Sequence, residues 1–264
     1  MSRLARTFRL LGLFWSSSFA AELEYRGNFL VSALTSVGGL AGALFGLSLF
    51  YRAGVLLGGW TFHEALLVMG CFTALTGFSR TFLSPNLSRI VEHVQKGTLD
   101  FVLLKPVDTQ LWLSSRRLSP WGIADVVLGL GIVGYAALRL DLAAAALFRG
   151  AVPLLAGATI LYSLWFLLAT TTIWFVKIYN VTEVLNALLD AGRFPIDAFP
   201  RGLYRFVFTF VVPVAFLTTV PAQAMLGRTS PTALLISCGL ALALFAVCRA
   251  FFRFALRYYT SASS

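Results

Sequence analysis

The chain of 264 residues is 58% hydrophobic and 12% charged, with a mean hydropathy of +0.82. A soluble domain averages about 45–50% apolar and about 25% charged residues, so this composition excludes a soluble fold and predicts an all-α integral membrane protein. The formal net charge of +10 could indicate nucleic-acid binding, but the 21 Lys and Arg residues form no dense basic run. We therefore expect no nucleic-acid partner, and we interpret the basic excess as a signal of membrane orientation.

An interfacial helix is predicted for residues 1–28. Its apolar core, residues 10–21, is 12 residues long, whereas a membrane-spanning helix needs about 20 residues. Arg3, Arg6 and Arg9 lie off the apolar side, as in a helix that rests on the cytoplasmic face of a bilayer. A true membrane span is the competing interpretation of this segment.

Six longer apolar stretches predict six membrane-spanning helices, at residues 29–51, 60–82, 121–139, 151–176, 206–226 and 232–253. With the N-terminus inside the cell, an even number of spans returns the C-terminus to the inside. This N-in/C-in arrangement places 17 of the 21 basic residues on the inner side and leaves out Arg52, Arg139, Arg149 and Arg228. The sequence therefore predicts a single transmembrane domain over residues 1–264.

The first predicted span carries a stripe of small residues at Gly38, Gly42 and Gly46. Glycines four residues apart allow two helices to approach closely in lipid, so the stripe predicts a packing face within the chain or between subunits. A generally high glycine content is the alternative explanation.

The fifth predicted span contains Pro213 and Pro221. Proline removes a backbone N–H and kinks a helix, so we expect a bent or broken element that could line a transport pathway. Pro221 could instead mark only the end of the helix. The inner loop before this span, residues 177–205, contains FPIDAFP, whose two prolines predict a rigid turn.

The inner loop 83–120 contains a predicted short helix from Ser84 to Gly97. Ser84 and Pro85 are typical of a helix start, and Gly97 is typical of a helix end. The apolar side of this helix is formed by Leu87, Ile90, Val91 and Val94. Off that side lie Arg89, Glu92, His93 and Lys96. The pattern fits a membrane boundary where a partner contacts the charged side, and the alternative is a solvated loop with a chance amphipathic turn.

Motifs for catalysis and for phosphate binding are missing from the sequence. It contains no GxxxxGK[ST], HExxH, CxxC or GxSxG motif. Its two histidines, His63 and His93, are predicted on opposite sides of the membrane, so they share neither a metal nor a catalytic task. We therefore expect no enzyme activity, no metal site and no cofactor on this chain.

Ionisable residues are absent from the middle of each predicted span. Ion-coupled transporters normally bind their ion at such groups within the membrane, so a permease driven by a separate motor is favoured. Asp125 lies near the inner start of the third span, where it could pair with Arg80 or Arg116. An ion-coupled secondary transporter is the alternative. An intramembrane enzyme lacks its polar residues, and a structural assembly factor stays open.

Four stretches resemble the membrane subunits of ABC-2 type transporters, in particular a group long catalogued as a domain of unknown function. They are GTLDFVLLKPVD (97–108), FPIDAFP (194–200), VVPVAFLTTVPAQAMLG (211–227) and RYYTSAS (257–263). The resemblance covers nearly the whole chain. It implies a multi-pass permease of the bacterial cell (inner) membrane that acts as a dimer with an identical or homologous permease chain.

The resemblance also implies a coupling helix between the second and third spans. This helix is expected to dock on a separate nucleotide-binding subunit, where ATP and Mg would bind. The coupling surface that it implies comprises Arg89, Glu92, His93, Lys96, Asp100 and Lys105. We expect export of an amphiphilic or lipid-like substrate driven by ATP hydrolysis on that subunit. The family fixes neither the cargo nor the identity of the two permease chains.

Overall fold

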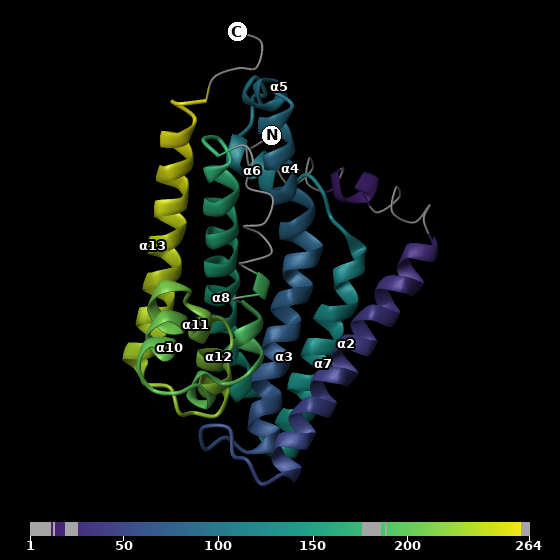
Figure 1. Cartoon of the computed structure of the whole chain (residues 1–264), viewed down its shortest axis with the longest axis vertical. Helices are drawn as coiled ribbons and strands as arrows, with labels where there is room; N and C mark the ends of the chain where they lie inside the picture. The colour runs from purple at the N-terminus through teal and green to yellow at the C-terminus, as the bar shows by residue number, and fades with distance from the viewer. Residues whose placement is uncertain (1–11, 13, 19–25, 176–185, 188, 260–264) are drawn as a thin grey trace.

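The computed structural model describes residues 12, 14–18, 26–175, 186–187 and 189–259, and within these ranges the chain is helical, without a β-strand (Figure 1). Five described segments are long and apolar enough to cross a membrane: Ala33–Arg52, Phe62–Gln95, Pro120–Arg139, Ala144–Thr171 and Pro231–Ala255. The expectation of an all-α membrane protein is confirmed. Most of the predicted interfacial helix, 1–28, lies outside the described residues.

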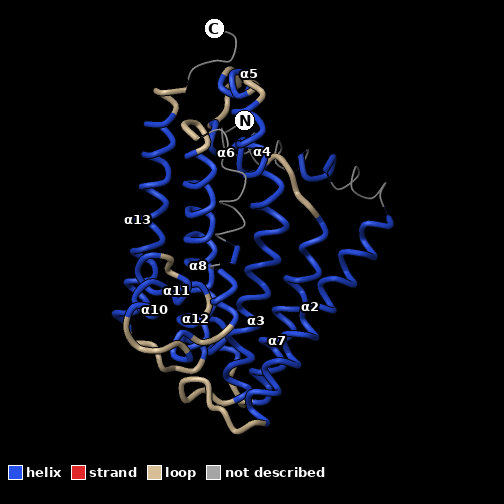
Figure 2. The backbone as a smooth tube through the Cα atoms, viewed as in Figure 1, coloured by secondary structure: helices blue, strands red, loops and turns tan. Residues whose placement is uncertain are grey.

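The long helices lie side by side along one axis of the molecule (Figures 1 and 2). They are α2 (Arg26–Arg52), α3 (Phe62–Phe78), α7 (Ile123–Arg139), α8 (Ala144–Thr171) and α13 (Pro231–Ala255). Helix α3 packs chiefly on α7, and α8 packs on α13 and on two short helices, α11 (Val214–Leu217) and α12 (Thr219–Met225). Helix α2 makes few contacts and leans away from α7 towards its N-terminal end (Figure 1).

The closest packing joins α3 and α7 through glycines on both helices. A Cβ atom built on Gly129 would lie close to the backbone nitrogen of Ala74, at 2.3 Å. One built on Gly77 would lie 2.4 Å from the backbone nitrogen of Val126. The two backbones leave no room for side chains at these positions, which is the kind of helix contact that small residues permit in lipid.

The glycine stripe on α2 is not packed in this way. No described atom comes within 4 Å of a Cβ built on Gly38, Gly42 or Gly46. Within the described part of the chain, no helix packs closely on this stripe. Packing between subunits stays a prediction.

The predicted second span and the predicted loop helix form one continuous helical segment. Helix α3 passes through a π-helical turn, η1 (Ser79–Leu83), into α4 (Ser84–Gln95) without an intervening loop. Ser84 therefore does not cap a helix, because the residues before it are already helical. Gly97, with φ +65°, follows the end of α4 as expected. Two short helices, α5 (Leu99–Leu103) and α6 (Thr109–Ser115), lead back towards α7.

Both described chain ends lie at the α4–α6 end of the bundle. The Trp15 indole N–H donates to the Ser115 carbonyl at 3.1 Å. Tyr259, which follows α13, packs against the hydrophobic cluster that contains Leu99 and Val102 of α5. Chain ends on one side agree with the predicted topology, and the assignment of that side to the cytoplasm stays a prediction.

The predicted fifth span, 206–226, is not one helix. The chain here forms α10 (Leu203–Phe206), a π-helical turn η5 (Val207–Val211), α11 and α12. Val212 is extended and Pro213 follows it without an N–H, so the helix breaks at this point. A second break lies at Thr218, and Pro221 lies in the first turn of α12, where proline is tolerated. Six continuous spans are therefore not confirmed, and a broken segment takes the place of the fifth.

The sequence predicted FPIDAFP on the same side of the membrane as the α4–α6 loop. The segment lies instead at the opposite end of the bundle. The Trp60 indole N–H donates to Asp197 Oδ2 at 3.1 Å, and the rings of Phe50 and Phe194 lie 6.3 Å apart. Phe50 and Trp60 flank the turn between α2 and α3, which is far from α4–α6 (Figure 1). Arg205, which pairs with Asp197 at 3.2 Å, therefore does not belong to the inner-side basic residues.

Candidate functional site

Helix α4 separates an apolar side from a charged side. Leu87 and Ile90 are fully buried and pack into a hydrophobic cluster that also contains Trp165 and Phe166 of α8. The apolar side thus contacts the core of the protein itself, whereas a helix lying on a bilayer would present it to lipid. The charged side is left available to a partner.

Hydrogen bonds order the charged side of α4. Lys96 Nζ lies 2.6 Å from Glu92 Oε1, one helical turn away. Both side chains are largely exposed, so this ion pair orients the two charges without adding much stability. His93 Nδ1 lies 2.7 Å from Thr98 Oγ1, which fixes the orientation of the imidazole ring.

Trp112 of α6 lies in a cationic depression beside this face of α4. Its ring centroid lies 4.7 Å from the Arg116 guanidinium carbon and 5.1 Å from Lys105 Nζ, both within cation–π reach. The depression has a volume of about 340 Å³ and contains four Lys and Arg side chains against one carboxylate, that of Glu92. This positive potential suits an acidic partner.

Five of the six residues implied for coupling line this depression, namely Arg89, Glu92, His93, Lys96 and Lys105. Asp100 does not. It lies near Tyr259, where burial raises the pKa of the tyrosine hydroxyl and the Asp100 carboxylate raises it further. Sequence reasoning missed Trp112 and Arg116, and the available signal was a tryptophan inside the most polar loop of an apolar chain.

Helix α5 presents apolar side chains next to the cationic depression. Phe101 is 69% exposed and Leu104 is 82% exposed. Both lie beyond the ends of the spanning helices, at the tip of the α4–α6 loop (Figure 1). Large apolar groups exposed outside the bundle indicate an interaction surface.

Hydrogen bonds tie α6 to two long helices. Arg249 of α13 donates to Asp108 Oδ2 at 2.6 Å, and this bond holds the pKa of the Asp108 carboxyl below its ordinary value. Tyr162 of α8 accepts from Gln110 Nε2 at 3.1 Å and lies 2.8 Å from Ser114 Oγ. These bonds link the α6 surface directly to α8 and α13.

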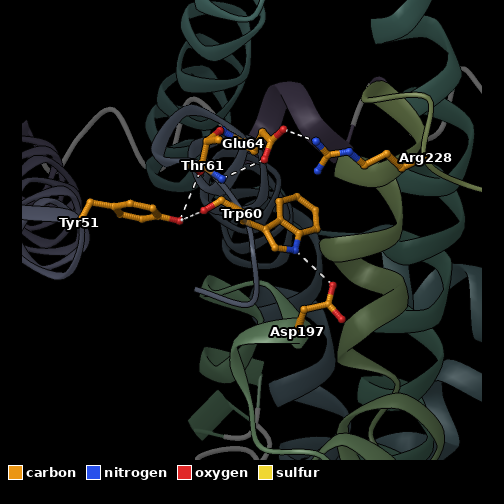
Figure 3. Close-up of polar contacts among 6 residues, drawn as sticks. All are labelled: Tyr51, Trp60, Thr61, Glu64, Asp197 and Arg228. Atoms are coloured by element: carbon orange, nitrogen blue, oxygen red, sulfur yellow. Dashed lines mark hydrogen bonds and ion pairs between the residues drawn. The ribbon is translucent and has the colours of Figure 1, made fainter. Parts of the chain in front are cut away.

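A polar cluster closes the opposite end of the bundle (Figure 3). The Tyr51 hydroxyl donates to the Trp60 carbonyl at 2.7 Å, which joins α2 to the start of α3. Glu64 of α3 pairs with Arg228, which lies between α12 and α13, and Trp60 reaches Asp197. Each of these groups is paired, so the cluster fastens four segments to one another. Among the described residues no group of three or more His, Cys, Asp or Glu is placed to hold a metal ion.

Long apolar helices in one bundle, with a cationic and aromatic surface beyond one end, define a multi-pass membrane protein. Comparison with protein families gives the particular group, because the model for ABC-2 family transporter proteins matches residues 37–263. This match covers most of the chain, so the protein belongs to the ABC-2 transporter family, and the resemblance noted from the sequence is confirmed. Searches of curated proteins and of solved structures found no match.

Proposed function

We propose that this chain is the permease subunit of an exporter in the bacterial inner membrane, and that a separate subunit hydrolyses ATP. Membership of the ABC-2 family supports this proposal, since permeases of this family generally work with a separate ATP-binding subunit. The cargo in this proposal is an amphiphilic or lipid-like molecule, and two permease chains, identical or homologous, form the pathway. The observation that carries the proposal is the cationic depression around Trp112.

The depression and the tip of α5 form the proposed docking surface. Cations around Trp112 favour a partner surface with a carboxylate rim, and electrostatic complementarity of this kind raises the association rate. The exposed Phe101 and Leu104 side chains need an apolar recess on that partner, and buried aromatic anchors supply most of the binding energy of an interface. Because α6 is bonded to α8 and α13, docking here acts directly on the bundle.

Asp125, the acidic residue of α7, is paired with Arg80, and this pairing weighs against ion coupling. Asp125 is 4% exposed and accepts from Arg80 Nη1 at 2.8 Å. This is one of the two pairings expected from the sequence, and it gives the carboxylate a structural role. In liposomes we expect an ion gradient alone to drive no flux. Ion-driven transport that Asp125→Asn abolishes would favour the secondary transporter instead.

The docking surface is tested by co-purifying the permease with its cognate ATP-binding subunit. We expect Phe101→Asp and Leu104→Asp each to abolish retention of that subunit and the ATPase activity that accompanies it. Leu56→Asp is the matched control, since Leu56 is 69% exposed, as Phe101 is, but lies at the opposite end of the bundle. Lys105→Glu with Arg116→Glu should weaken association more at low salt than at high salt.

The same experiment contains the result that would overturn the proposal. Retention of the ATP-binding subunit by both α5 variants, together with undiminished ATPase activity, would place the docking surface elsewhere. Full solute flux from the permease reconstituted without any nucleotide-hydrolysing subunit would contradict an ATP-driven mechanism altogether.

A further inference from the structure

A cavity of about 300 Å³ lies inside the bundle, between α3, α8, α11 and a short 3-10 helix, η3 (Ala191–Arg193). This volume is at the lower end of the range found for small-molecule sites, roughly 300–1,000 Å³. One wall is largely apolar and is formed by Leu75, Leu161, Trp165 and Leu217, but the buried Trp165 indole N–H has no hydrogen-bond partner among the described residues. The other wall is polar and belongs to the π-helical junction between α3 and α4. A two-faced lining of this kind matches an amphiphile.

Three hydroxyl groups on the polar wall have no hydrogen-bond partner within the described residues. They belong to Thr76, Ser79 and Ser84. Elsewhere in the same helices Thr73 donates to the Met69 carbonyl at 2.8 Å. Thr76 and Ser79 are partly exposed and Ser84 is exposed, so these hydroxyls are open to the cavity and need no internal partner. The costly unpaired group is the buried indole N–H of Trp165, because an unpaired donor away from water is unfavourable. The free hydroxyls at the cavity are therefore available to a ligand.

An adjoining smaller cavity shows the same property. It shares Phe72, Thr76 and Arg80 with the first and extends to Ser36 and Gly39 of α2. Ser36 is 6% exposed, and its hydroxyl has no partner among the described residues. The polar lining therefore continues from the interior of the bundle towards α2.

The charges at these cavities cancel in pairs. The Arg80 guanidinium is balanced by Asp125 at 2.8 Å, and Arg193 is balanced by Asp190 at 3.5 Å. Each guanidinium keeps further N–H donors for a neutral acceptor. A charged head group would add an uncompensated charge beside these two pairs. The lining thus favours an uncharged head group that both donates and accepts hydrogen bonds.

A route for an apolar tail leads from the cavity to the glycine stripe of α2. Arg193 lies 5.3 Å from the centroid of the Phe72 ring, where the two cavities meet. A third hollow, of about 540 Å³, runs along Gly38, Gly42 and Gly46 and also contacts Arg193. Because no described atom packs closely on these glycines, a hydrocarbon chain can lie there and reach the lipid.

We propose that the cavity beside Thr76, Ser79 and Arg80 binds the head group of a non-ionic, hydroxyl-rich amphiphile, such as a glycoside with an alkyl or acyl tail. This inference rests on the proposed permease function and names the class of its cargo. The head group bonds to the free hydroxyls and to the paired guanidinium of Arg80, and the tail lies along α2.

The test uses the full-length permease alone, in phosphatidylcholine nanodiscs, with an alkyl glucoside that carries a photoactivatable diazirine in its chain. We expect labelling of α2, α3 and α8 that octyl glucoside suppresses, and we expect octyl phosphate and octyltrimethylammonium to suppress it far less. Thr76→Val with Ser79→Ala should weaken glucoside binding about tenfold, because two neutral hydrogen bonds are lost. Thr159→Val is the matched control, since that hydroxyl donates to the Leu155 carbonyl at 3.0 Å and the residue lines none of these cavities, and it should leave binding unchanged.

Each other outcome is decisive. Equal competition by octyl phosphate would overturn the neutral head group. Labelling that the double variant leaves unaltered would assign the signal to lipid around the protein. Because the assay contains no ATP-binding subunit, it is independent of the proposed function. Absent glucoside binding with intact ATP-driven transport would overturn this inference alone, and binding without ATP-driven transport would overturn the proposed function alone.

Discussion

Trp60 and Asp197 lie 137 residues apart in the sequence, yet the Trp60 indole N–H donates to Asp197 Oδ2 at 3.1 Å (Figure 3). The bond joins the turn between α2 and α3 to the FPIDAFP segment. Trp60 is 3% exposed, so without Asp197 its indole N–H could not form a hydrogen bond to bulk water instead. The contact therefore fixes FPIDAFP at the end of the bundle away from α4–α6.

Replacing Trp60 by Phe keeps a buried aromatic ring but removes the donor. Since hydrogen bonds to charged groups contribute about 1.5–3 kcal/mol, we expect Trp60→Phe to lower the free energy of unfolding by that amount. Unfolding in detergent by heat or denaturant measures the loss. Trp15→Phe is the control, because Trp15 is 36% exposed and donates to a neutral carbonyl. An equal loss in both variants would contradict the proposed strength of the Trp60 bond.

The turn beside Trp60 offers a second comparison, between two neighbouring glycines. Gly58 has φ +64° and Gly59 has φ +84°, so an alanine at either position is strained by about 1–2 kcal/mol. A Cβ on Gly58 would also lie 2.4 Å from the Asp197 backbone carbon, whereas a Cβ on Gly59 would meet no described atom within 4 Å. We expect Gly58→Ala to reduce the free energy of unfolding by a further ~1–3 kcal/mol, as overpacking does. Indistinguishable unfolding midpoints would show that FPIDAFP does not lie against this turn.

Two glycines on α7 test the close contact between α3 and α7. Gly129→Ala places a methyl group against the backbone of Ala74, and we expect a loss of about 1–3 kcal/mol in stability. Gly131 has no described atom within 4 Å of its built Cβ. Gly131→Ala should therefore be neutral or stabilising by up to about 1 kcal/mol through helix propensity. Thermal unfolding of both variants measures these changes in stability. An unchanged unfolding temperature for Gly129→Ala would mean that α3 and α7 are further apart than in this structure.

The Asp108–Arg249 bond predicts a dependence of stability on pH. Arg249 lowers the pKa of Asp108 in the folded protein, so the stabilisation is present above the unfolded pKa, about 3.9, and is lost as the pH falls through the lower folded value. The Asp108 side chain is 41% exposed, which limits the effect to less than about 1 kcal/mol. Arg249→Gln should flatten the acid part of the curve of unfolding temperature against pH.

The control for this experiment is Arg257→Gln. Arg257 is exposed and makes no ion pair in the part of the chain that the structure describes. Its replacement should leave the acid dependence as in the native protein. A curve that Arg249→Gln leaves unchanged would show that the Asp108 carboxyl does not depend on Arg249.

Local patterns predicted the local features of this protein. The apolar spacing of Leu87 and Ile90 correctly indicated a one-sided helix, Gly97 marked its end, and Asp125 was expected to pair with Arg80. The glycine spacing on the first span pointed to a packing face that the described chain does not use, because helix spacing alone does not say what lies opposite.

The long-range features had no such signal. The bond from Trp60 to Asp197 joins residues with no shared pattern, and the basic-residue count assigned Arg205 to the inner side because it assumed that 206–226 crosses as one helix. Pro213 indicated a break in the helix, since proline has no backbone N–H, but it could not show the path of the chain after the break. Trp112 was missed because its cationic neighbours come from both sides of α6.

The uninterrupted helix Phe62–Gln95 has 34 residues, which at 1.5 Å per residue makes it about 50 Å long. Glu64 lies near one end and Glu92 near the other, so this segment connects the proposed docking surface to the ion pair between Glu64 and Arg228 at the opposite end of the bundle. The segment is irregular at the π-helical turn Ser79–Leu83, and Ser79 and Arg80 of this turn form part of the wall of the cavity between α3 and α8. The proposed docking surface and the wall of the proposed cargo cavity thus belong to one helical segment, so a displacement of α4 by a partner would also displace residues that line the cavity.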